Sequence, residues 1–386
     1  MPAAVETPRT KEELGEALRQ AASADRAIEL YGGGTKRAMG GAVAPAGVRI
    51  STACLRRVLE YEPHDLTISV EAGLPWRELT EVLARNRQMI PLDPPFADAA
   101  TVGGVIAANS CGPRRRLYGS ARDLVIGMKF ATLEGKIVQS GGMVVKNVAG
   151  LDMAKLMIGS FGTLAGIVSV NFKLSPMPES ERSFLVAFDS LPSAVAARNK
   201  VLAGPLQPSA IDLLSPAAGA AVGRGSWLLA IRAGGNLQAV ERTEREIAAL
   251  GEAVALDDAA HATLWERIAE FTPQFLAAHP DGAVVRASCT LKEVEPVLES
   301  FGGPALARAG TGVCYGYFES SAAAARWMSE HVPGRSKAVI EFAPEAARSA
   351  LDLWPAPGGD LELMRRIKLL FDPRSLLNRG RLYNRI

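Results

Sequence analysis

Short runs of apolar residues, each with its own period, fill the first part of the chain. Apolar positions recur at helical spacing behind Thr10, and Thr10 with Glu13 gives a capping-box pattern that predicts where this helix begins. Residues 27–31 and 48–50 predict short strands, and the Gly- and Ala-rich stretch between them carries no helical pattern. Residues 67–72 alternate between apolar and polar side chains, as expected of a half-buried strand.

The next predicted elements are equally short. Pro75 suits the first residue of a helix, and Thr101 suits the N-cap of a short helix made of small residues. A hairpin is expected to turn at residues 134–135. After a helical segment over residues 151–158, the pattern predicts a strand over residues 164–174.

The Pro-rich stretch at residues 175–180 is the predicted domain boundary. Beyond it the pattern predicts strands at 184–188, 226–231, 283–287, 312–318 and 338–342 and helices at 191–202 and 237–250. This alternation suits an antiparallel sheet with helices on one face. The expected domains are residues 1–175, residues 176–355, and a C-terminal helix and tail over residues 356–386.

The overall composition excludes several classes of protein. With 386 residues the chain suits two domains, and its net charge of +2 predicts no strong field for nucleic acid. No run of ~18 apolar residues predicts a membrane span. The four cysteines contain no C-x-x-C, which argues against an iron–sulfur or zinc site in this chain and favours a reduced cytoplasmic protein. The four histidines have no metal-ligand spacing, so no metal site is predicted.

Glycine is the informative residue, because the 37 glycines gather in clusters. Gly32, Gly33 and Gly34 precede Thr35 and Lys36, and consecutive glycines let backbone amides converge on a diphosphate without obstruction by Cβ atoms. The string is neither G-x-G-x-x-G nor a Walker A loop, and no helix follows it, so a Rossmann or P-loop assignment fails. An ordinary tight turn is the competing interpretation.

The segment from Thr101 to Gly104 is a second candidate for anion binding. If Thr101 caps a short helix, the amides of residues 102–104 point outward at the positive end of the helix dipole. Gly103 and Gly104 would then let an anion or a flat ring approach closely. Tight packing of this helix against a strand explains the same glycines equally well.

Further loops also place glycine beside polar residues. Residues 109–112 and 118–120 enclose an arginine triplet at residues 114–116, which we interpret as a solvated or partner-facing surface rather than a phosphate site. Residues 146–152 and 159–164 form another such pair. Loops of this kind, gathered within about 130 residues, exceed what a purely structural domain needs and indicate a bound ligand.

In this order, the loops resemble those of the vanillyl-alcohol-oxidase-type FAD-binding flavoproteins, the family with the PCMH-type FAD domain. The motifs that carry the resemblance are YGGGTKR (31–37), EAGLPWRELTEVL (71–83), PLDPPFADAATVGGVIAANSCGPRRRLYGSARDLVIG (91–127), VVKNVAGLDMAKLMIGSFGTLAGI (144–167) and FDPRSLLNRGRLY (371–383). Within the family the chain is most similar to FAD-binding (E-type) subunits of bacterial glycolate oxidases. The resemblance implies an α+β fold, with a PCMH-type FAD-binding domain of two α+β subdomains and a ferredoxin-like α+β cap domain.

The resemblance also implies roles for single residues. Residues 32–36 would form the first pyrophosphate loop, and residues 101–104 would continue the diphosphate cradle and reach the flavin. Asn109, Ser110 and Gly112 would lie near the isoalloxazine ring. The full set implied to bind FAD is Gly32, Gly33, Gly34, Thr35, Lys36, Pro94, Thr101, Val102, Gly103, Gly104, Ala107, Asn109, Ser110, Gly112, Gly119, Asp123, Gly162, Ile167 and, from a tail that folds back toward the FAD domain, Asn378.

Some positions depart from the family pattern. Arg379 stands where the tail usually has proline, and Ala165 stands where the strand-entry motif usually has glycine. The first glycine loop has no histidine of the kind that binds flavin covalently, so non-covalent FAD is expected. The His-rich site of catalytic 2-hydroxyacid dehydrogenases is also missing, and no catalytic residue is assigned.

The function implied by the resemblance is that of an FAD-carrying subunit of a glycolate oxidase complex. The complex would oxidise glycolate to glyoxylate, with a paralogous FAD-containing catalytic subunit and an iron–sulfur subunit as partners, in the cytoplasm or peripherally on the inner membrane. Two alternatives remain open. One is a self-sufficient FAD-dependent 2-hydroxyacid dehydrogenase, and the other is a non-catalytic interaction subunit that retains the fold.

Overall fold

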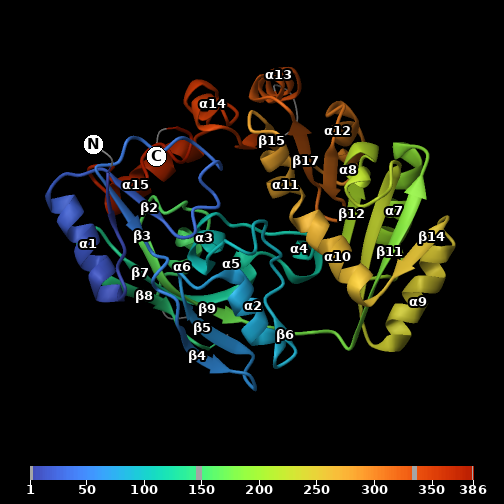
Figure 1. Ribbon diagram of the computed structural model, residues 1–386, viewed down its shortest axis with the longest axis horizontal. Helices are drawn as coiled ribbons and strands as arrows, with labels where there is room; N and C mark the ends of the chain where they lie inside the picture. Colours follow the sequence, from blue (N-terminus) through green and yellow to red (C-terminus); the bar gives the residue numbers. More distant parts are fainter. Residues whose placement is uncertain (1–2, 145–149, 333–336, 385) are drawn as a thin grey trace. The chain divides into compact units, whose positions relative to one another are not determined.

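The computed structural model describes residues 3–144, 150–332, 337–384 and 386, and the chain divides into two compact units (Figure 1). The first unit consists of Met1–Cys111, Ser120–Met177 and Ala356–Ile386, and the second of Gly112–Gly119 and Pro178–Pro355. Both ends of the chain therefore belong to the first unit. No helix in the described part of the chain is long and apolar enough to cross a membrane.

The first unit contains two main sheets. A parallel sheet has the order β1 (Ala4–Glu6), β3 (Val48–Ser51), β2 (Ile28–Tyr31). An antiparallel sheet has the order β4 (Val58–Glu62), β5 (Thr67–Glu71), β9 (Gly166–Lys173), β7 (Val125–Ala131), β8 (Ile137–Gly141), and β6 (Gln88–Met89) pairs separately with β10 (Ser175–Pro176). The helices of this unit are α1 (Lys11–Ser23), α2 (Trp76–Ala84), α3 (Val102–Ala107), α5 (Ala121–Leu124), α6 (Ala154–Met157) and α15 (Asp360–Phe371).

Local capping fixes the start of α1, as the sequence predicts. Thr10 Oγ1 accepts a hydrogen bond from the Glu13 amide at 3.1 Å. The Glu13 carboxylate accepts from the Arg9 amide instead of the Thr10 amide, so only half of the capping box forms. The helix expected over residues 151–158 is reduced to the four residues of α6.

Strand β5 is more buried than its alternating pattern predicts. All five of its residues are buried, because β5 lies between β4 and β9 and its polar side chains also find partners. Ser69 donates to Asn171 Oδ1 at 2.8 Å, and the Glu71 carboxylate accepts hydrogen bonds from Arg57. The prediction of a half-buried strand is therefore wrong.

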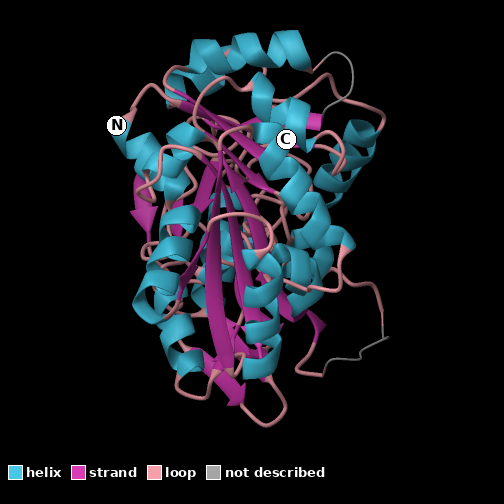
Figure 2. Ribbon diagram, turned by 90° about the vertical axis from the view of Figure 1, so that its right-hand side faces the viewer, coloured by secondary structure: helices cyan, strands magenta, loops and turns pink. Residues whose placement is uncertain are grey.

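The second unit is built on one eight-stranded sheet, and every neighbouring pair of its strands is antiparallel. Figure 2 draws the strands of the protein in magenta and its helices in cyan. Its strand order is β14 (Ala253–Leu256), β11 (Ser180–Phe188), β13 (Trp227–Gly235), β12 (Ala210–Leu214), β16 (Ala305–Arg308), β17 (Val313–Phe318), β15 (Ala283–Ser288), β18 (Lys337–Phe342). Its helices are α4 (Arg115–Tyr118), α7 (Leu191–Ala203), α8 (Pro216–Ala220), α9 (Leu237–Ala248), α10 (Asp258–Ala269), α11 (Phe271–Ala278), α12 (Val294–Ser300), α13 (Ser321–His331) and α14 (Glu345–Ala350).

Helices cover both faces of this sheet rather than one. Phe184 and alternate residues of the other strands form an apolar core with α7, α9, α12 and α13. The opposite face contacts α10 and α11, where Trp265 Nε1 donates to Ser183 and the hydroxyls of Thr272 and Tyr317 lie 3.0 Å apart. The expectation of helices on a single face is therefore wrong, because polar side chains under α10 and α11 conceal the second buried face from a hydrophobic pattern.

Candidate functional site in the first unit

The glycine loop at residues 32–36 follows β2 and packs directly against the segment that precedes α3. A Cβ atom at Gly32 would lie 2.1 Å from Thr101 Oγ1, and a Cβ atom at Gly33 would lie 2.0 Å from the Ala99 carbonyl oxygen. Gly34 has a φ of +73°, which other residues rarely adopt. Close packing and backbone conformation therefore explain why all three positions are glycine.

The amide groups of the same loop remain available for another partner. Among the described residues, none provides an acceptor for the backbone N–H groups of Gly32, Gly33, Gly34 or Thr35. Successive amides of this kind form a concave site for an anion. Packing and backbone conformation thus require glycine at residues 32–34. The loop still has free backbone N–H groups of the kind that a diphosphate needs.

The backbone amides at the start of α3, in contrast, already have acceptors within the protein. Val102 donates to the Leu74 carbonyl at 2.9 Å, Gly103 to the Ala72 carbonyl at 2.7 Å, and Gly104 to Thr101 Oγ1 at 3.4 Å. A Cβ atom at Gly103 would lie 2.8 Å from Ala72 Cβ. The prediction of an N-cap at Thr101 is confirmed, but the prediction that the amides of residues 102–104 point outward to a ligand is wrong. The backbone that follows β5 accepts from residues 102 and 103, and the cap itself accepts from Gly104.

The C-terminal end of α3 meets the loop at residues 159–163. The amides of Gly159 and Phe161 donate to the carbonyls of Ile106 and Ala107 at 3.1 and 2.9 Å. Asn109 follows the helix with a φ of +49°, and its Oδ1 is buried without a hydrogen-bond partner in the described part of the chain. A buried acceptor left unpaired costs about 1–3 kcal/mol, so a donor from a ligand would stabilise this position.

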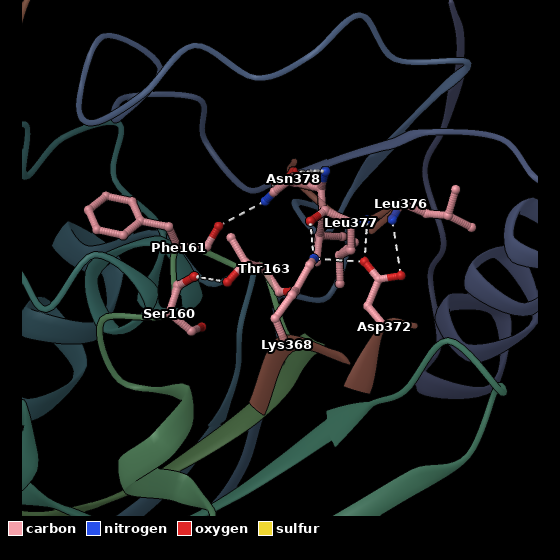
Figure 3. Close-up of polar contacts among 9 residues, drawn as sticks. Ser160, Phe161, Thr163, Lys368, Asp372, Leu376, Leu377 and Asn378 are labelled. Carbon is pink, nitrogen blue, oxygen red and sulfur yellow. Dashed lines mark hydrogen bonds and ion pairs between the residues drawn. The ribbon is translucent and has the colours of Figure 1, made fainter. Parts of the chain in front are cut away.

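Asn378 attaches the C-terminal tail to both β2 and the 159–163 loop (Figure 3). Its Oδ1 accepts from the Leu30 amide at 2.8 Å, and its Nδ2 donates to the carbonyls of Leu30 and Phe161 at 3.0 and 2.9 Å. Gly162 has a φ of +67°, and a Cβ atom there would lie 2.9 Å from Asn378 Nδ2. Both N–H groups of the Asn378 amide are used within the protein, so this side chain shapes the loop.

A buried ion pair beside Asn378 supports the same loop, and the sequence did not single it out. Lys368, 3% exposed, donates from Nζ to Asp372 Oδ2 and to the carbonyls of Thr163 and Leu377 at 2.7–2.8 Å (Figure 3). Asp372, fully buried, also accepts from the amides of Leu376 and Leu377. Burial lowers the pKa of Lys368, while the hydrogen bond to Asp372 opposes this change. The i,i+4 spacing of a lysine and an aspartate is visible in the sequence, but its burial is not.

The charge of Lys36 is directed into the protein. Its Nζ donates to the Pro95 carbonyl at 2.9 Å and lies 4.6 Å from the centre of the Phe96 ring. Arg381 from the tail donates to the carbonyls of Lys36 and Arg37. Lys36 and Arg381 therefore hold the glycine loop against the 95–101 segment and the tail.

The structure accounts for both departures from the family pattern. Arg379 is exposed, and its carbonyl accepts from the Ala44 amide at 2.9 Å, so the tail still docks without proline. Ala165 is 1% exposed and belongs to the apolar core of the first unit.

Other predicted site residues have mainly structural contacts. Pro94 and Ser110 are buried, Ala107 is half-buried, Ile167 lies in the core within β9, and the Asp123 carboxylate accepts from Ser120 at the start of α5. Gly112 and Gly119 belong to the second unit. Residues 146–149 of the predicted 146–152 loop lie outside the described residues.

The second unit carries ionisable side chains on the sheet face that α10 and α11 partly cover. Arg308 pairs with the fully buried Asp212, and Arg232 donates two hydrogen bonds to Glu181 at 2.8 and 3.0 Å. Burial alone would raise the pKa of Glu181, but hydrogen bonds with His261 and Arg232 outweigh it and lower this pKa to about 2. In the described part of the chain, no group of three or more His, Cys, Asp or Glu side chains is placed to hold a metal ion.

Taken together, the contacts in the first unit fit a dinucleotide. Residues 32–33 touch residues 99–101, the end of α3 bonds to the 159–161 backbone, and the tail bonds to β2 and to Phe161. The free amides of residues 32–35 suit linking phosphates, and the unpaired Asn109 Oδ1 suits a ring N–H donor.

Comparison with known proteins identifies the ligand that this region takes. Residues 2–141 match the FAD binding domain family, and residues 356–382 match the C-terminal domain of FAD linked oxidases. The chain is 36% identical over 171 residues to glycolate oxidase subunit GlcE of Escherichia coli (strain K12), covering 44% of this chain and 48% of that protein. It is 29% identical over 214 residues to glycolate oxidase subunit GlcD of Bacillus subtilis (strain 168), covering 55% and 46%. The chain thus spans about half the length of these relatives.

A solved structure establishes the fold. p-Cresol methylhydroxylase with substrate bound superposes with a TM-score of 0.78 over 98% of this chain and 88% of that chain, at 15% identity. The predicted α+β fold with a PCMH-type FAD-binding domain is confirmed, as is FAD as the cofactor.

Proposed function

We propose, from the premise that residues 2–141 form an FAD binding domain and residues 356–382 belong to the C-terminal domain of FAD linked oxidases, that this protein is the FAD-carrying subunit of a glycolate oxidase complex. The complex oxidises glycolate, a 2-hydroxy acid, to glyoxylate. FAD is held non-covalently and, when bound, supplies an acceptor for the hydride that leaves the hydroxyl-bearing carbon.

The free amides of the glycine loop carry this proposal. The N–H groups of residues 32–35 would hold the linking phosphates, and Lys36 and Arg381 keep the loop in place. Asn109 would accept a hydrogen bond from the flavin through its unpaired Oδ1. Lys368, Asp372 and Asn378 position the 159–163 backbone.

Electrons leave the complex through partners. The four cysteines of the chain have no cluster-binding spacing, so iron–sulfur clusters belong to another subunit. The resemblance to subunits of glycolate oxidase supports a second, paralogous FAD-containing subunit that carries the catalytic side chains.

The test begins with the purified chain and its visible absorption spectrum. We expect the bands of oxidised flavin, and acid precipitation should release the flavin into the supernatant as FAD. A colourless protein that stays colourless after incubation with FAD would disprove cofactor binding. Flavin retained in the precipitate would disprove the non-covalent mode alone.

A second candidate is a self-sufficient 2-hydroxyacid dehydrogenase. It is favoured by Arg308, whose buried Nε has no hydrogen-bond partner in the described part of the chain and could receive a substrate carboxylate. Anaerobic addition of glycolate or D-lactate distinguishes the two. Bleaching of the flavin in the isolated chain at rates of ~1–10³ per second favours the self-sufficient enzyme. Bleaching only in the presence of the paralogous subunit favours the complex.

A further inference from the structure

Two cysteines of the second unit are positioned as a dithiol. Cys289 directly follows β15 and Cys314 lies in β17, where it pairs with Ala287. Their Sγ atoms are 3.9 Å apart. Cys289 is partly exposed whereas Cys314 is fully buried, so a reagent from solvent reaches Cys289 first.

A buried guanidinium lies close to this pair. Arg198, on α7 and 1% exposed, donates to the carbonyls of Leu291 and Ala309, which flank the two cysteines in the adjoining loops. Within the described residues Arg198 forms no ion pair, although the charge of Glu295 acts on it, and its Nε has no hydrogen-bond partner. A buried cation stabilises a nearby thiolate.

The environment of Cys289 agrees with this role. The hydrogen bond with Cys314 lowers the pKa of Cys289, burial and the charge of Glu293 oppose the change, and Arg198 adds a smaller lowering. The pKa of Cys314 is raised well above its usual value, first by the same hydrogen bond and then by burial. Since Cys289 is also the more exposed of the two, we assign Cys289 as the nucleophile and Cys314 as the resolving thiol.

We propose that Cys289 and Cys314 form a modification site at which a hydroperoxide oxidises the dithiol to an intramolecular disulfide. With hydrogen peroxide as the oxidant, the Cys289 thiolate attacks one oxygen, the O–O bond breaks, and sulfur keeps that oxygen as a sulfenic acid; the other oxygen leaves as hydroxide, which takes up the proton that Cys289 released to solvent and becomes water. The Cys314 sulfur then attacks Cys289, the S–O bond breaks, and a second water leaves with the Cys314 proton. Two thiols lose two electrons, and one hydrogen peroxide becomes two waters.

The geometry requires only a local movement for this step. The two sulfurs must close from 3.9 Å to the ~2 Å of a disulfide bond. The amide of Cys289 continues the pairing of β15 by donating to the Gly312 carbonyl at 2.8 Å, and rotation of the side chain about its Cα–Cβ bond does not break that hydrogen bond. The Cys289 thiol donates a hydrogen bond to the Gly312 carbonyl at 3.3 Å, and this bond is given up when the thiolate forms.

The experiment uses the full, reduced protein and hydrogen peroxide. After a short exposure, free thiols are alkylated and the digested protein is analysed by mass spectrometry. We expect a cross-linked peptide that joins residues 289 and 314 and disappears with dithiothreitol, and Cys289 should be consumed roughly tenfold faster than the exposed Cys54. Equal consumption of both thiols, or cross-links that join other cysteines, would overturn the proposal.

Three variants sharpen the result. Cys314→Ser removes the resolving thiol, so a sulfenic acid at Cys289 should accumulate and be trapped by dimedone; no adduct would overturn the proposal. Arg198→Met should slow the reaction of Cys289, whereas Cys54→Ser should leave it unchanged. The Cys314→Ser result stands by itself even where Arg198→Met destabilises the protein.

Discussion

At the scale of single residues, packing and ligand binding make separate demands on the glycine loop. The side of Gly32 and Gly33 that would carry a Cβ is filled by Thr101 and Ala99, and the amides remain unpaired. At Gly103 the same packing demand holds, but the amide is already bonded to Ala72. The 32–35 and 101–104 segments look alike in sequence. They differ in whether their backbone amides already have an acceptor within the protein, and only unpaired amides are available to a ligand.

Gly33→Ala tests this distinction. The new Cβ would lie 2.0 Å from the Ala99 carbonyl, so the loop must shift, at a cost of about 1–3 kcal/mol. We expect FAD affinity, measured by titration of the apoprotein, to fall at least about tenfold. Gly225→Ala is the matched control because nothing lies within 4 Å of its added Cβ. Equal FAD affinity in both variants would contradict a role for the loop.

At the scale of elements, the sequence predicts the helices and turns that are determined by residues close together in the chain. The caps of α1 and α3 and the turn between β7 and β8 agree with the structure because each depends on a few neighbouring residues. β12 was missed because Asp212 interrupts its apolar run, and the burial of Asp212 depends on its ion pair with Arg308, 96 residues away. The burial of Lys368 likewise depends on the turn of the tail after α15.

Lys368→Met is expected to uncouple α15 from the 159–163 loop. It leaves Asp372 charged and buried and the Thr163 carbonyl without its donor, so the free energy of unfolding should fall by about 3–5 kcal/mol in urea titrations. The double variant Lys368→Met with Asp372→Asn removes the uncompensated charge and should be more stable than Lys368→Met alone. A double variant that is less stable by the sum of both single changes would argue against a coupled pair.

Glu181 makes the free energy of unfolding of the second unit depend on pH. Its pKa is about 2 in the folded protein against 4.5 as the ordinary value, so its stabilising effect is complete above pH 4.5 and is lost as the pH falls toward 2. Between pH 6 and pH 3, the wild type should lose up to about 2 kcal/mol more than Glu181→Gln in urea unfolding. The exposed Glu179→Gln should behave as the wild type. An equal pH dependence in all three proteins would exclude this source of acid sensitivity.

At the scale of the whole molecule, the chain contributes Gly112–Gly119 and then Pro178–Pro355 to the second unit, and its last 31 residues, Ala356–Ile386, belong to the first unit again. This return places the two matched FAD-linked segments, 2–141 and 356–382, in one unit despite more than 200 residues between them. The sequence predicts the return only through resemblance to the family. The periodicity of α15 does not show which surface that helix will cover.

FAD binding should therefore stabilise the tail and the glycine loop together. FAD at 100 times its Kd stabilises the unit that binds it by about 2.7 kcal/mol. In native-state hydrogen exchange, this protection should appear in peptides from the 28–37 region and equally in peptides from the 372–382 tail, because Asn378 bonds to Leu30 on both its amide and its carbonyl. Asn378→Ala breaks those bonds while the tail keeps Lys368 and Asp372, so tail peptides should lose the FAD-dependent protection before the glycine loop does. Protection confined to the 28–37 region in the wild type would mean that the tail is not stabilised by FAD. That result would contradict the positioning role assigned to Asn378.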